Sequence, residues 1–470
     1  MPEDSVPGCF AFAFLRLRRR RPAAPVALST SHPHSHTDTG CCDFSLLASH
    51  EHARVEKDDA ALPEYSCGGY AFDEAATKTV EETIEALDGE LRELSLKIHD
   101  HPELAFQEKY AHDALTSFME SHAFTVTRHY LGYDTAWLAT LQVGSGGRIL
   151  GFNSEMDALP GIGHACGHNL IAIGGVAAAI GVATALKKHN LSGTVSLIGT
   201  PAEEGGGGKI LLLNKGAYKD FAACLMIHPV PGPAHSTGLG SSLAVQRIEA
   251  EFAGHTAHAS AAPWEGRNAL DAAFVSYTAL SALRQQVKPT HRIHGIVSGR
   301  DWAANIIPDY AKLSYGIRAP THNEVGALEP RVKACFEAGA HATNTKLTYT
   351  ASLAMYDLFQ NGALSSEYRR TWEGRFGRPI ATGPAGSLGG STDFGNISYA
   401  VPGLHPAYAI PTVENGGNHT RSFADAAATP EAHTATLYAA KGIALTGLRV
   451  LLDKEFADKV MEDFKAGKPQ

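Results

Sequence analysis

The sequence is poor in cysteine and has no excess of positive charge. Only 7 of its 470 residues are cysteines, a small and odd number that argues against a disulfide framework. Such a composition favours a reducing compartment, so we expect a cytoplasmic protein. The 40 basic residues are outnumbered by 49 acidic ones, and the net charge of -9 argues against non-specific nucleic-acid binding. The length is sufficient for two or three domains, or for one large domain with an insertion.

The sequence also lacks a clear membrane span and a secretory signal. The longest apolar run, Leu170 to Leu186, is interrupted by glycines and followed by two lysines, which predicts a buried helix. Near the start, the chain is apolar from Cys9 and becomes basic towards Arg21, the reverse of the order in a secretory signal. An Arg-rich organelle presequence is the alternative.

Two common catalytic motifs are missing. There is no G-x-S-x-G motif, which argues against a serine hydrolase of that type. The glycine-rich stretch that precedes Lys209 has the composition of a phosphate-binding loop. However, Ile210 stands where such a loop needs serine or threonine, and the first glycine of the spacing is absent.

The chain is organised around residues 153–169, which read NSEMDALPGIGHACGHN. An apolar strand is predicted before this stretch and a long apolar helix after it, so the stretch connects a strand to a helix. It carries Cys166 and His168, and also the carboxylates Glu155 and Asp157. Thiolate, imidazole and carboxylate are the ligands of zinc and similar divalent ions. Taken alone, Cys166 is more often a small buried apolar residue than a ligand.

Two further predicted strands end at residues of the same chemical kind. The strand at 194–199 leads into Glu203 and Glu204, which four glycines follow, and the strand at 222–227 ends at His228. Parallel strands bring their carboxyl ends to one edge of a sheet, so these side chains are expected in one cleft. We assign Glu204 to the metal and Glu203 to the general base, because a metal lowers the pKa of bound water and a nearby carboxylate takes its proton. The alternative is a solvated acidic loop.

Histidines complete the candidate site. His228 and His419 are each more often structural when taken singly, but together with the earlier residues they complete a ligand set. Such a set suits one ion with a water, or two ions that share ligands. His258, in GHTAHAS, lies elsewhere in the chain, and a closing lid could bring it to the reaction centre. The predicted metal ligands are Cys166, His168, Glu204, His228 and His419.

The order of the predicted elements divides the chain into an α/β catalytic domain and an insertion. Residues 1–75 show no sustained periodicity and are predicted to be a disordered extension. Residues 76–244 and 356–470 are predicted to form the two parts of the catalytic domain. Between them, residues 245–355 follow the order β-α-β-β-α-β, which predicts an inserted α+β domain of the ferredoxin-like kind.

Five motifs in this order resemble the M20 metallopeptidase family, subfamily D. They are GHACGHN, PAEEGGGGK, a His-Pro after a strand, GHTAHASAAPWEGRNALDA and a late Asn-His-Thr, and they span about residue 76 to the C-terminus. The sequence is most similar to the branch of β-alanyl-lysine dipeptidase-like proteins. The resemblance implies a zinc-peptidase-like α/β domain with a lid that also dimerises, and therefore a homodimer.

The resemblance also implies a role for each matching residue. It implies the five metal ligands given above, Glu203 as general base and Asp157 as the residue that orients a ligand. His258 matches a lid histidine that reaches the partner subunit's site and stabilises the oxyanion, and Asn305 and Arg318 match lid positions that touch substrate. The wider family has a histidine where this sequence has Glu155, so the number of ions, one or two, stays open.

The sequence therefore predicts a metal-dependent amidohydrolase. We expect it to cleave the amide bond of dipeptides or of N-acyl or aminoacyl amino acids, with zinc or manganese as the metal. The alternatives are an N-acyl-amino-acid deacylase and, from another class, a metal-free binding protein of the same fold. No nucleic-acid or membrane partner is expected.

Overall fold

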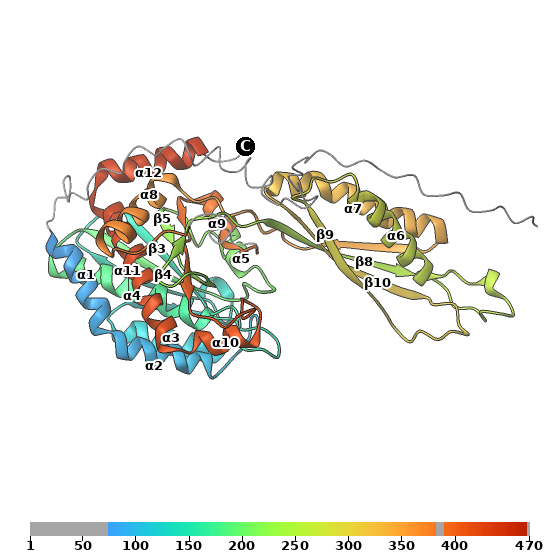
Figure 1. Ribbon diagram of the computed structural model, residues 1–470, viewed down its shortest axis with the longest axis horizontal. Helices are drawn as coiled ribbons and strands as arrows, with labels where there is room; N and C mark the ends of the chain where they lie inside the picture. Colours follow the sequence, from blue (N-terminus) through green and yellow to red (C-terminus); the bar gives the residue numbers. More distant parts are fainter. Residues whose placement is uncertain (1–73, 382–389, 468–470) are drawn as a thin grey trace, which may run out of the picture. The chain divides into compact units, whose positions relative to one another are not determined.

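The computed structural model describes residues 74–381 and 390–467 (Figure 1). The predicted disordered extension, residues 1–75, lies outside the described residues except for its last two. Those two, Glu74 and Ala75, begin helix α1 (Glu74–Ala86), so the boundary of the extension was predicted slightly too late.

A six-stranded sheet forms the centre of the catalytic part. Its order is β1-β2-β4-β3-β5-β12, in which β3, β4, β5 and β12 are parallel and β2 is antiparallel to both its neighbours. A separate three-stranded sheet has the order β6-β13-β7. The strands are β1 (Thr125–Arg128), β2 (Trp137–Val143), β3 (Ile149–Glu155), β4 (Gly193–Thr200), β5 (Phe221–Leu225), β6 (His228–Pro231), β7 (Thr237–Gly238), β12 (Gly403–Leu404) and β13 (Ala407–Ile410).

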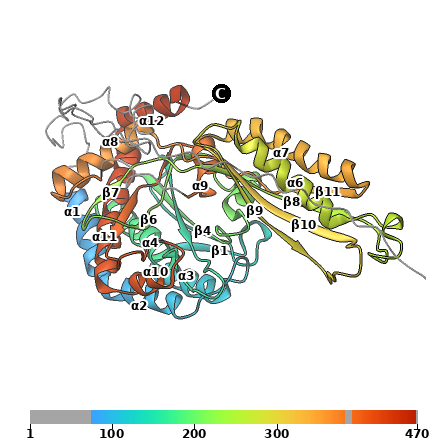
Figure 2. The same ribbon diagram turned by 45° about the vertical axis from the view of Figure 1, so that its right-hand side comes forward.

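Helices cover both faces of the six-stranded sheet (Figures 1 and 2). Neighbouring residues of a strand point to opposite faces, and Leu197 and Ile198 of β4 accordingly belong to two different apolar clusters. The Leu197 side is covered by α4, which packs against α1, α2 and α11, and the Ile198 side by α5 and α9. These and the other helices of this part are α2 (Asp88–His99), α3 (Lys109–Ser121), α4 (His168–Lys188), α5 (Gly208–Asn214), α8 (Gly362–Arg370), α9 (Phe394–Ala400), α10 (Arg421–Ala427), α11 (Pro430–Leu452) and α12 (Lys454–Gly467).

The structure corrects two details of the sequence prediction. The apolar spacing from Val80 to Ile98 predicts one continuous helix, but the structure has two, since α1 ends at Ala86 and α2 starts at Asp88. Aspartate is favourable in a first turn and the following Gly89 is a poor helix former, which explains the break. The second correction concerns His228, which begins β6, whereas the preceding strand β5 already ends at Leu225.

The inserted part has its own sheet and its own core. Four antiparallel strands are ordered β11-β8-β10-β9, and α6 and α7 pack on the sheet around an apolar cluster that includes Phe252, Leu313 and Phe336. This order confirms the predicted ferredoxin-like insertion. Its elements are β8 (Ala244–Ala253), α6 (Ala269–Arg284), β9 (Arg292–Gly299), β10 (Tyr310–Ala319), α7 (His322–Thr343) and β11 (Lys346–Ala351).

Two described helices, α4 and α11, are long and apolar enough to cross a membrane by length and composition. Their most apolar windows are 94% and 78% buried inside the protein, however. Both therefore serve as core helices of this fold, as predicted for residues 170–186.

Candidate active site

Three strand ends and one helix start bring the predicted ligands to the same edge of the sheet. Strand β3 ends two residues before Asp157, β4 leads into Glu203 and Glu204, and β5 leads to His228. Helix α4 begins at His168, next to Gly167. Gly167 has φ +78°, and a Cβ there would lie 2.6 Å from the ring of Pro229, so this turn needs glycine.

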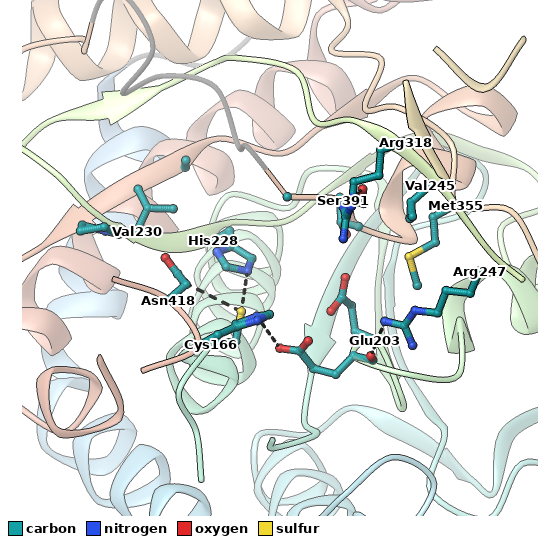
Figure 3. A pocket seen from close by; sticks show the side chains of 16 residues that line it. Cys166, Glu203, His228, Val230, Val245, Arg247, Arg318, Met355, Ser391 and Asn418 are labelled. Atoms are coloured by element: carbon teal, nitrogen blue, oxygen red, sulfur yellow. Dashed lines mark hydrogen bonds and ion pairs between the residues drawn. The ribbon is translucent and has the colours of Figure 1, made fainter. Parts of the chain in front are cut away.

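A pocket of about 400 Å³ is lined by Cys166, Glu203, Glu204, His228 and His419, among others (Figure 3). Cys166, His228 and Asn418 lie on one side of it, and Arg247, Arg318 and Met355 lie on the other. The catalytic part supplies the first group, whereas Arg247 of β8 and Arg318 of β10 come from the inserted part. The pocket therefore combines candidate metal ligands with two cationic side chains.

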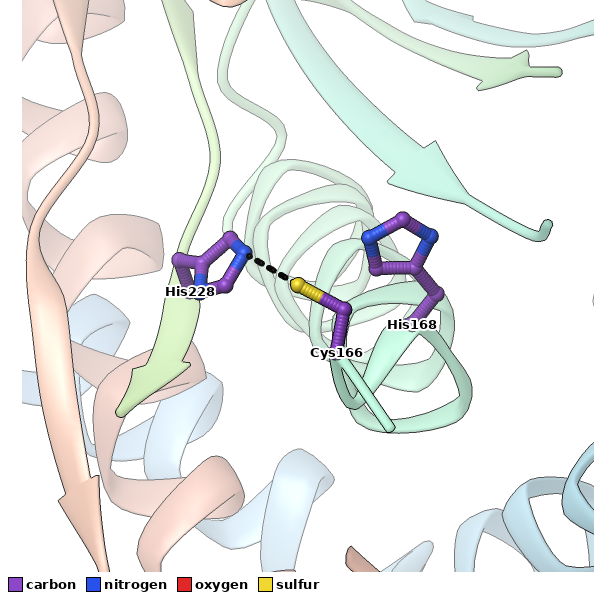
Figure 4. A group of neighbouring side chains, drawn as sticks. All are labelled: Cys166, His168 and His228. Atoms are coloured by element: carbon purple, nitrogen blue, oxygen red, sulfur yellow. Dashed lines mark hydrogen bonds between the residues drawn. The ribbon is translucent and has the colours of Figure 1, made fainter. Parts of the chain in front are cut away.

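The five predicted metal ligands form two clusters that share one thiol. Cys166, His168 and His228 make the first cluster (Figure 4), and Cys166, Glu204 and His419 make the second. Within each cluster the donor atoms lie within 4.8 Å of one another. The Sγ of Cys166 is 3.5 Å from Nε2 of His228, and Nε2 of His419 is 3.2 Å from Oε1 of Glu204.

The donor atoms of these clusters fit a divalent cation. Nε2 of His168 and Oε1 of Glu204 are buried, and although Oε2 of Glu155 and Nε2 of His419 lie 3.3 Å and 3.2 Å from them, neither atom makes a hydrogen bond of acceptable geometry in the described structure. Burial raises the pKa of the Cys166 thiol to about 12, so a nearby cation is needed to hold this residue as thiolate. Burial also lowers the pKa of His228, which keeps its imidazole neutral and able to ligate.

Asp157 holds two of these residues in place. Its Oδ1 is 3.2 Å from Nδ1 of His168, and its Oδ2 accepts a hydrogen bond of 2.9 Å from the backbone N–H of Glu204. A carboxylate on the outer nitrogen of a ligating histidine fixes the tautomer and the ring orientation. Asp157 thereby turns Nε2 of His168 towards the cluster.

Glu203 lies beside the clusters and is almost fully buried. One of its carboxylate oxygens is within 4.8 Å of donor atoms of both His168 and Glu204. Burial, together with the neighbouring carboxylates of Glu155 and Asp393, raises the pKa of Glu203 well above its ordinary value. A carboxylate in such surroundings binds a proton readily, as a general base requires.

Two predicted residues of the inserted part do not line this pocket. His258 and Asn305 are exposed on the inserted part and neighbour each other, since the backbone N–H of Ala259 donates to the carbonyl of Asn305 at 3.0 Å. Nδ1 of His258 accepts from the N–H of Ala261 at 3.1 Å. Neither side chain is among the residues that line the pocket of the same chain.

The sequence prediction missed four residues of the site and its surroundings. Arg247 donates to the backbone carbonyl of Glu204 at 3.0 Å, and Asn418 donates to the carbonyl of Pro229 at 3.1 Å. Lys209 and Asp393 pair beneath the pocket, where Nζ and Oδ1 are 2.6 Å apart. The sequence offered a local indication for two of these residues, since Lys209 directly follows the glycines and Asn418 directly precedes His419. No local pattern indicates that Arg247 or Asp393 belongs to the site.

Comparison with known proteins supports a common origin with metal-dependent amide hydrolases. The profile of Peptidase family M20/M25/M40 matches residues 151–437. The Xaa-Arg dipeptidase of Mus musculus is 39% identical over 404 residues, which cover 83% of this chain and 91% of that protein. The Xaa-Arg dipeptidase of Homo sapiens is 37% identical over 426 residues, which cover 85% of this chain and 94% of that protein.

Solved structures agree on the fold. A dinuclear metal-binding peptidase of the M20 family from Bacillus subtilis superimposes with a TM-score of 0.61 at 21% identity, over 78% of this chain and 99% of that one. The aminobenzoyl-glutamate utilization protein of Klebsiella pneumoniae gives a TM-score of 0.60 at 18% identity, over 79% of this chain and 98% of that one.

Proposed function

The chain belongs to peptidase family M20/M25/M40 and is a metal-dependent hydrolase of peptide or amide bonds, and on this premise we propose that it is a dipeptidase with two metal ions. Its substrate would be a dipeptide with a free C-terminal carboxylate. The observation that carries the proposal is the sharing of Cys166 by two ligand clusters at the wall of a pocket that also holds two arginines.

Cys166, His168 and His228 would hold one ion, and Cys166, Glu204 and His419 the other. Zinc and manganese both suit such a mixed set of sulfur, nitrogen and oxygen donors, and the thiolate favours zinc. When bound, the ions supply Lewis-acid polarisation of the amide carbonyl and a water of lowered pKa. A cytoplasmic location, which we also propose, would keep the thiol of Cys166 reduced.

Glu203 would move the proton. Its buried carboxylate accepts a proton from the attacking water and donates it to the nitrogen of the leaving amino acid. Asp157 supports this step indirectly, because it holds the backbone of Glu204 and the ring of His168 at fixed positions. The residues of the chain thus supply the proton transfer and the alignment.

The two arginines would anchor the substrate. Arg318 is already oriented, since its Nη1 donates to Oγ of Ser391 at 2.7 Å, and Arg247 is anchored on the carbonyl of Glu204. A guanidinium matches a carboxylate in shape and charge, so the C-terminal carboxylate of a dipeptide fits this side of the pocket. The relative from mouse is named for Xaa-Arg dipeptides, which carry such a carboxylate.

A homodimer would complete the site. His258 and Asn305 lie outside the pocket of their own chain, and the nearby Trp264 and Ile306 expose 78% and 44% of their surfaces. Ile296, on the edge strand β9, is 66% exposed. Exposed apolar residues of this size favour association, and a paired copy would carry His258 of the partner subunit to an oxyanion in this pocket.

Turnover of a substrate panel tests the proposal. The metal-free protein is reloaded with zinc, manganese or cobalt and assayed with β-alanyl-lysine, alanyl-arginine, hippurate, indoleacetyl-alanine and aminobenzoyl-glutamate. We expect metal-dependent cleavage of a dipeptide and little cleavage of the same dipeptide as its C-terminal amide. A preference for hippurate would indicate an N-acyl-amino-acid deacylase. Bound metal without turnover of any substrate would refute the proposal that the protein is a dipeptidase.

Sedimentation tests the dimer separately. We expect the wild-type chain to sediment as a dimer and Ile296→Asp to shift it towards the monomer. Leu353→Asp, at an exposed apolar residue outside β8–β11, is the matched control and should not change the mass. A wild-type monomer that turns over dipeptides at full rate would exclude a role for the partner's His258.

A further inference from the structure

A buried ion cluster lies directly behind the active site. The ammonium of Lys209 donates to Oε1 of Glu155 and to Oδ1 of Asp393, both at 2.6 Å, and the backbone N–H of Lys209 donates to Oδ2 of Asp393 at 2.9 Å. All three side chains are fully buried. Lys209 therefore binds Asp393 twice and Glu155 once, away from water.

This lysine stands where a cation is needed. The carboxylates of Glu155, Glu203 and Asp393 lie within 4.8 Å of one another, and all three are buried. Three carboxylates at that spacing repel one another strongly in a medium of low dielectric constant. Burial alone would lower the pKa of Lys209, but Asp393 and Glu155 raise it above the ordinary value, so the side chain stays an ammonium.

The backbone ties Lys209 to the loop that carries the catalytic residues. After Glu203 and Glu204 the glycine stretch turns the chain back, and at Gly208 an added Cβ would lie 1.8 Å from the carbonyl oxygen of Pro201. This close approach places Lys209, the residue after Gly208, beneath the loop that carries Glu203 and Glu204. Lys209 and Glu203 are therefore linked through one tightly packed turn.

Glu155 connects the cluster to the metal ligands. Its Oε1 is held by Lys209, while its Oε2 lies 3.3 Å from Nε2 of His168 and has no hydrogen-bond partner in the described structure. Nε2 of His168 is the atom that would bind metal. A Glu155 released from Lys209 could turn towards this atom and compete for it.

We propose that the ammonium of Lys209 is a built-in cation that positions the general base Glu203 and restrains Glu155, at a place where three buried carboxylates lie close enough together to hold a metal ion. This inference rests on the proposed function for the role of Glu203. Lys209 acts through its neighbours and does not line the pocket, so it is a positioning residue.

The test removes the ammonium and then returns it in solution. Lys209→Ala deletes three methylenes and the amine, which are the atoms of propylammonium, and 1-propanol is the neutral molecule of the same shape. Lys441→Ala is the matched control, because Lys441 is also nearly buried, pairs with Glu85 at 2.7 Å and lies away from the pocket. For each variant kcat, KM, bound metal and the melting temperature are measured with and without either compound.

We expect Lys209→Ala to lower kcat by about 10- to 100-fold, the usual effect of losing a residue that orients a metal site, with little change in KM. Propylammonium should restore part of kcat and raise the melting temperature of this variant only, and 1-propanol should do neither. An unchanged kcat would overturn the proposal, and so would a loss that propylammonium does not restore.

The two proposals fail in distinguishable ways. Absence of turnover by the metal-loaded wild-type chain refutes the dipeptidase. The melting temperatures still report on Lys209 in that case, because stabilisation of Lys209→Ala by propylammonium but not by 1-propanol needs no substrate. Equal stabilisation of the Lys209→Ala and Lys441→Ala variants by propylammonium would overturn the proposal that Lys209 is a built-in cation.

Discussion

Removing the metal ligands one at a time should change the metal content in whole equivalents. The Sγ of Cys166 belongs to both clusters, whereas His228 belongs only to the first and His419 only to the second. The expected content follows directly from this membership: about two equivalents in the wild-type chain, about one in His228→Ala or His419→Ala, and almost none in Cys166→Ala. In the last variant each ion would keep only two protein ligands.

The two ions should also differ in how easily they leave. The side chain of His419 is 56% exposed, while that of His168, in the other cluster, is fully buried. An ion at an exposed ligand exchanges with solvent and chelators more readily, so the ion of Cys166, Glu204 and His419 should be lost first. A titration of the wild-type protein with a weak chelator should therefore pass through a state with about one equivalent.

Elemental analysis after gel filtration measures these contents. His101→Ala is the control for non-specific binding, because His101 is exposed and stacks on Tyr110 far from the ligand set in sequence. The reasoning is refuted if Cys166→Ala keeps both ions. It is also refuted if His228→Ala and His419→Ala each lose both ions, because the clusters would then not be separable.

Three other perturbations have expected outcomes. Glu203→Gln should lower kcat by about 10²- to 10⁴-fold without changing the metal content, because glutamine has the shape of glutamate but cannot act as a general base. Steady-state kinetics and elemental analysis measure these two quantities, and full activity would exclude this role for Glu203. Arg318→Met should raise KM for a dipeptide about 10- to 100-fold, the effect of losing a charge-assisted hydrogen bond, and should leave KM for the C-terminal amide unchanged. In the metal-free protein, burial would raise the pKa of Glu155, but Lys209 and His168 lower it to about 2 from an ordinary 4.5. A lowered folded-state pKa stabilises the fold above pH 4.5, and this contribution, on the order of 3 kcal/mol, is lost as the pH falls from 4.5 towards 2. Urea unfolding at pH 5 and pH 3 should accordingly show that the free energy of unfolding falls less on acidification in Glu155→Gln than in the wild-type chain. An equal decrease in both proteins would contradict this account.

Local spacing was enough to indicate the residues of the candidate metal site. Cys166 and His168 are two residues apart, Glu203 and Glu204 are adjacent, and each pair follows an apolar strand. Parallel strands place such ends at one edge, so the grouping of these residues could be predicted without coordinates. The inserted part was predictable for the same reason, since its alternation and helical spacing repeat over short ranges.

Other features depended on contacts between residues far apart in the chain. Lys209 pairs with Asp393 across 184 positions and with Glu155 across 54, and no local pattern records either contact. In the sequence, Arg247 occupies an ordinary polar position on a predicted strand. Only the tertiary fold brings its side chain to the carbonyl of Glu204.

The amino-acid sequence by itself determined which residues could hold metal and which could move a proton, because those properties belong to the side chains and to their short spacings. Only the tertiary structure decided that Cys166 is common to two clusters, that Lys209 sits among three carboxylates, and that His258 lies outside the pocket of its own chain. These outcomes depend on how sheets, helices and loops pack, which is set by many weak contacts over the whole fold.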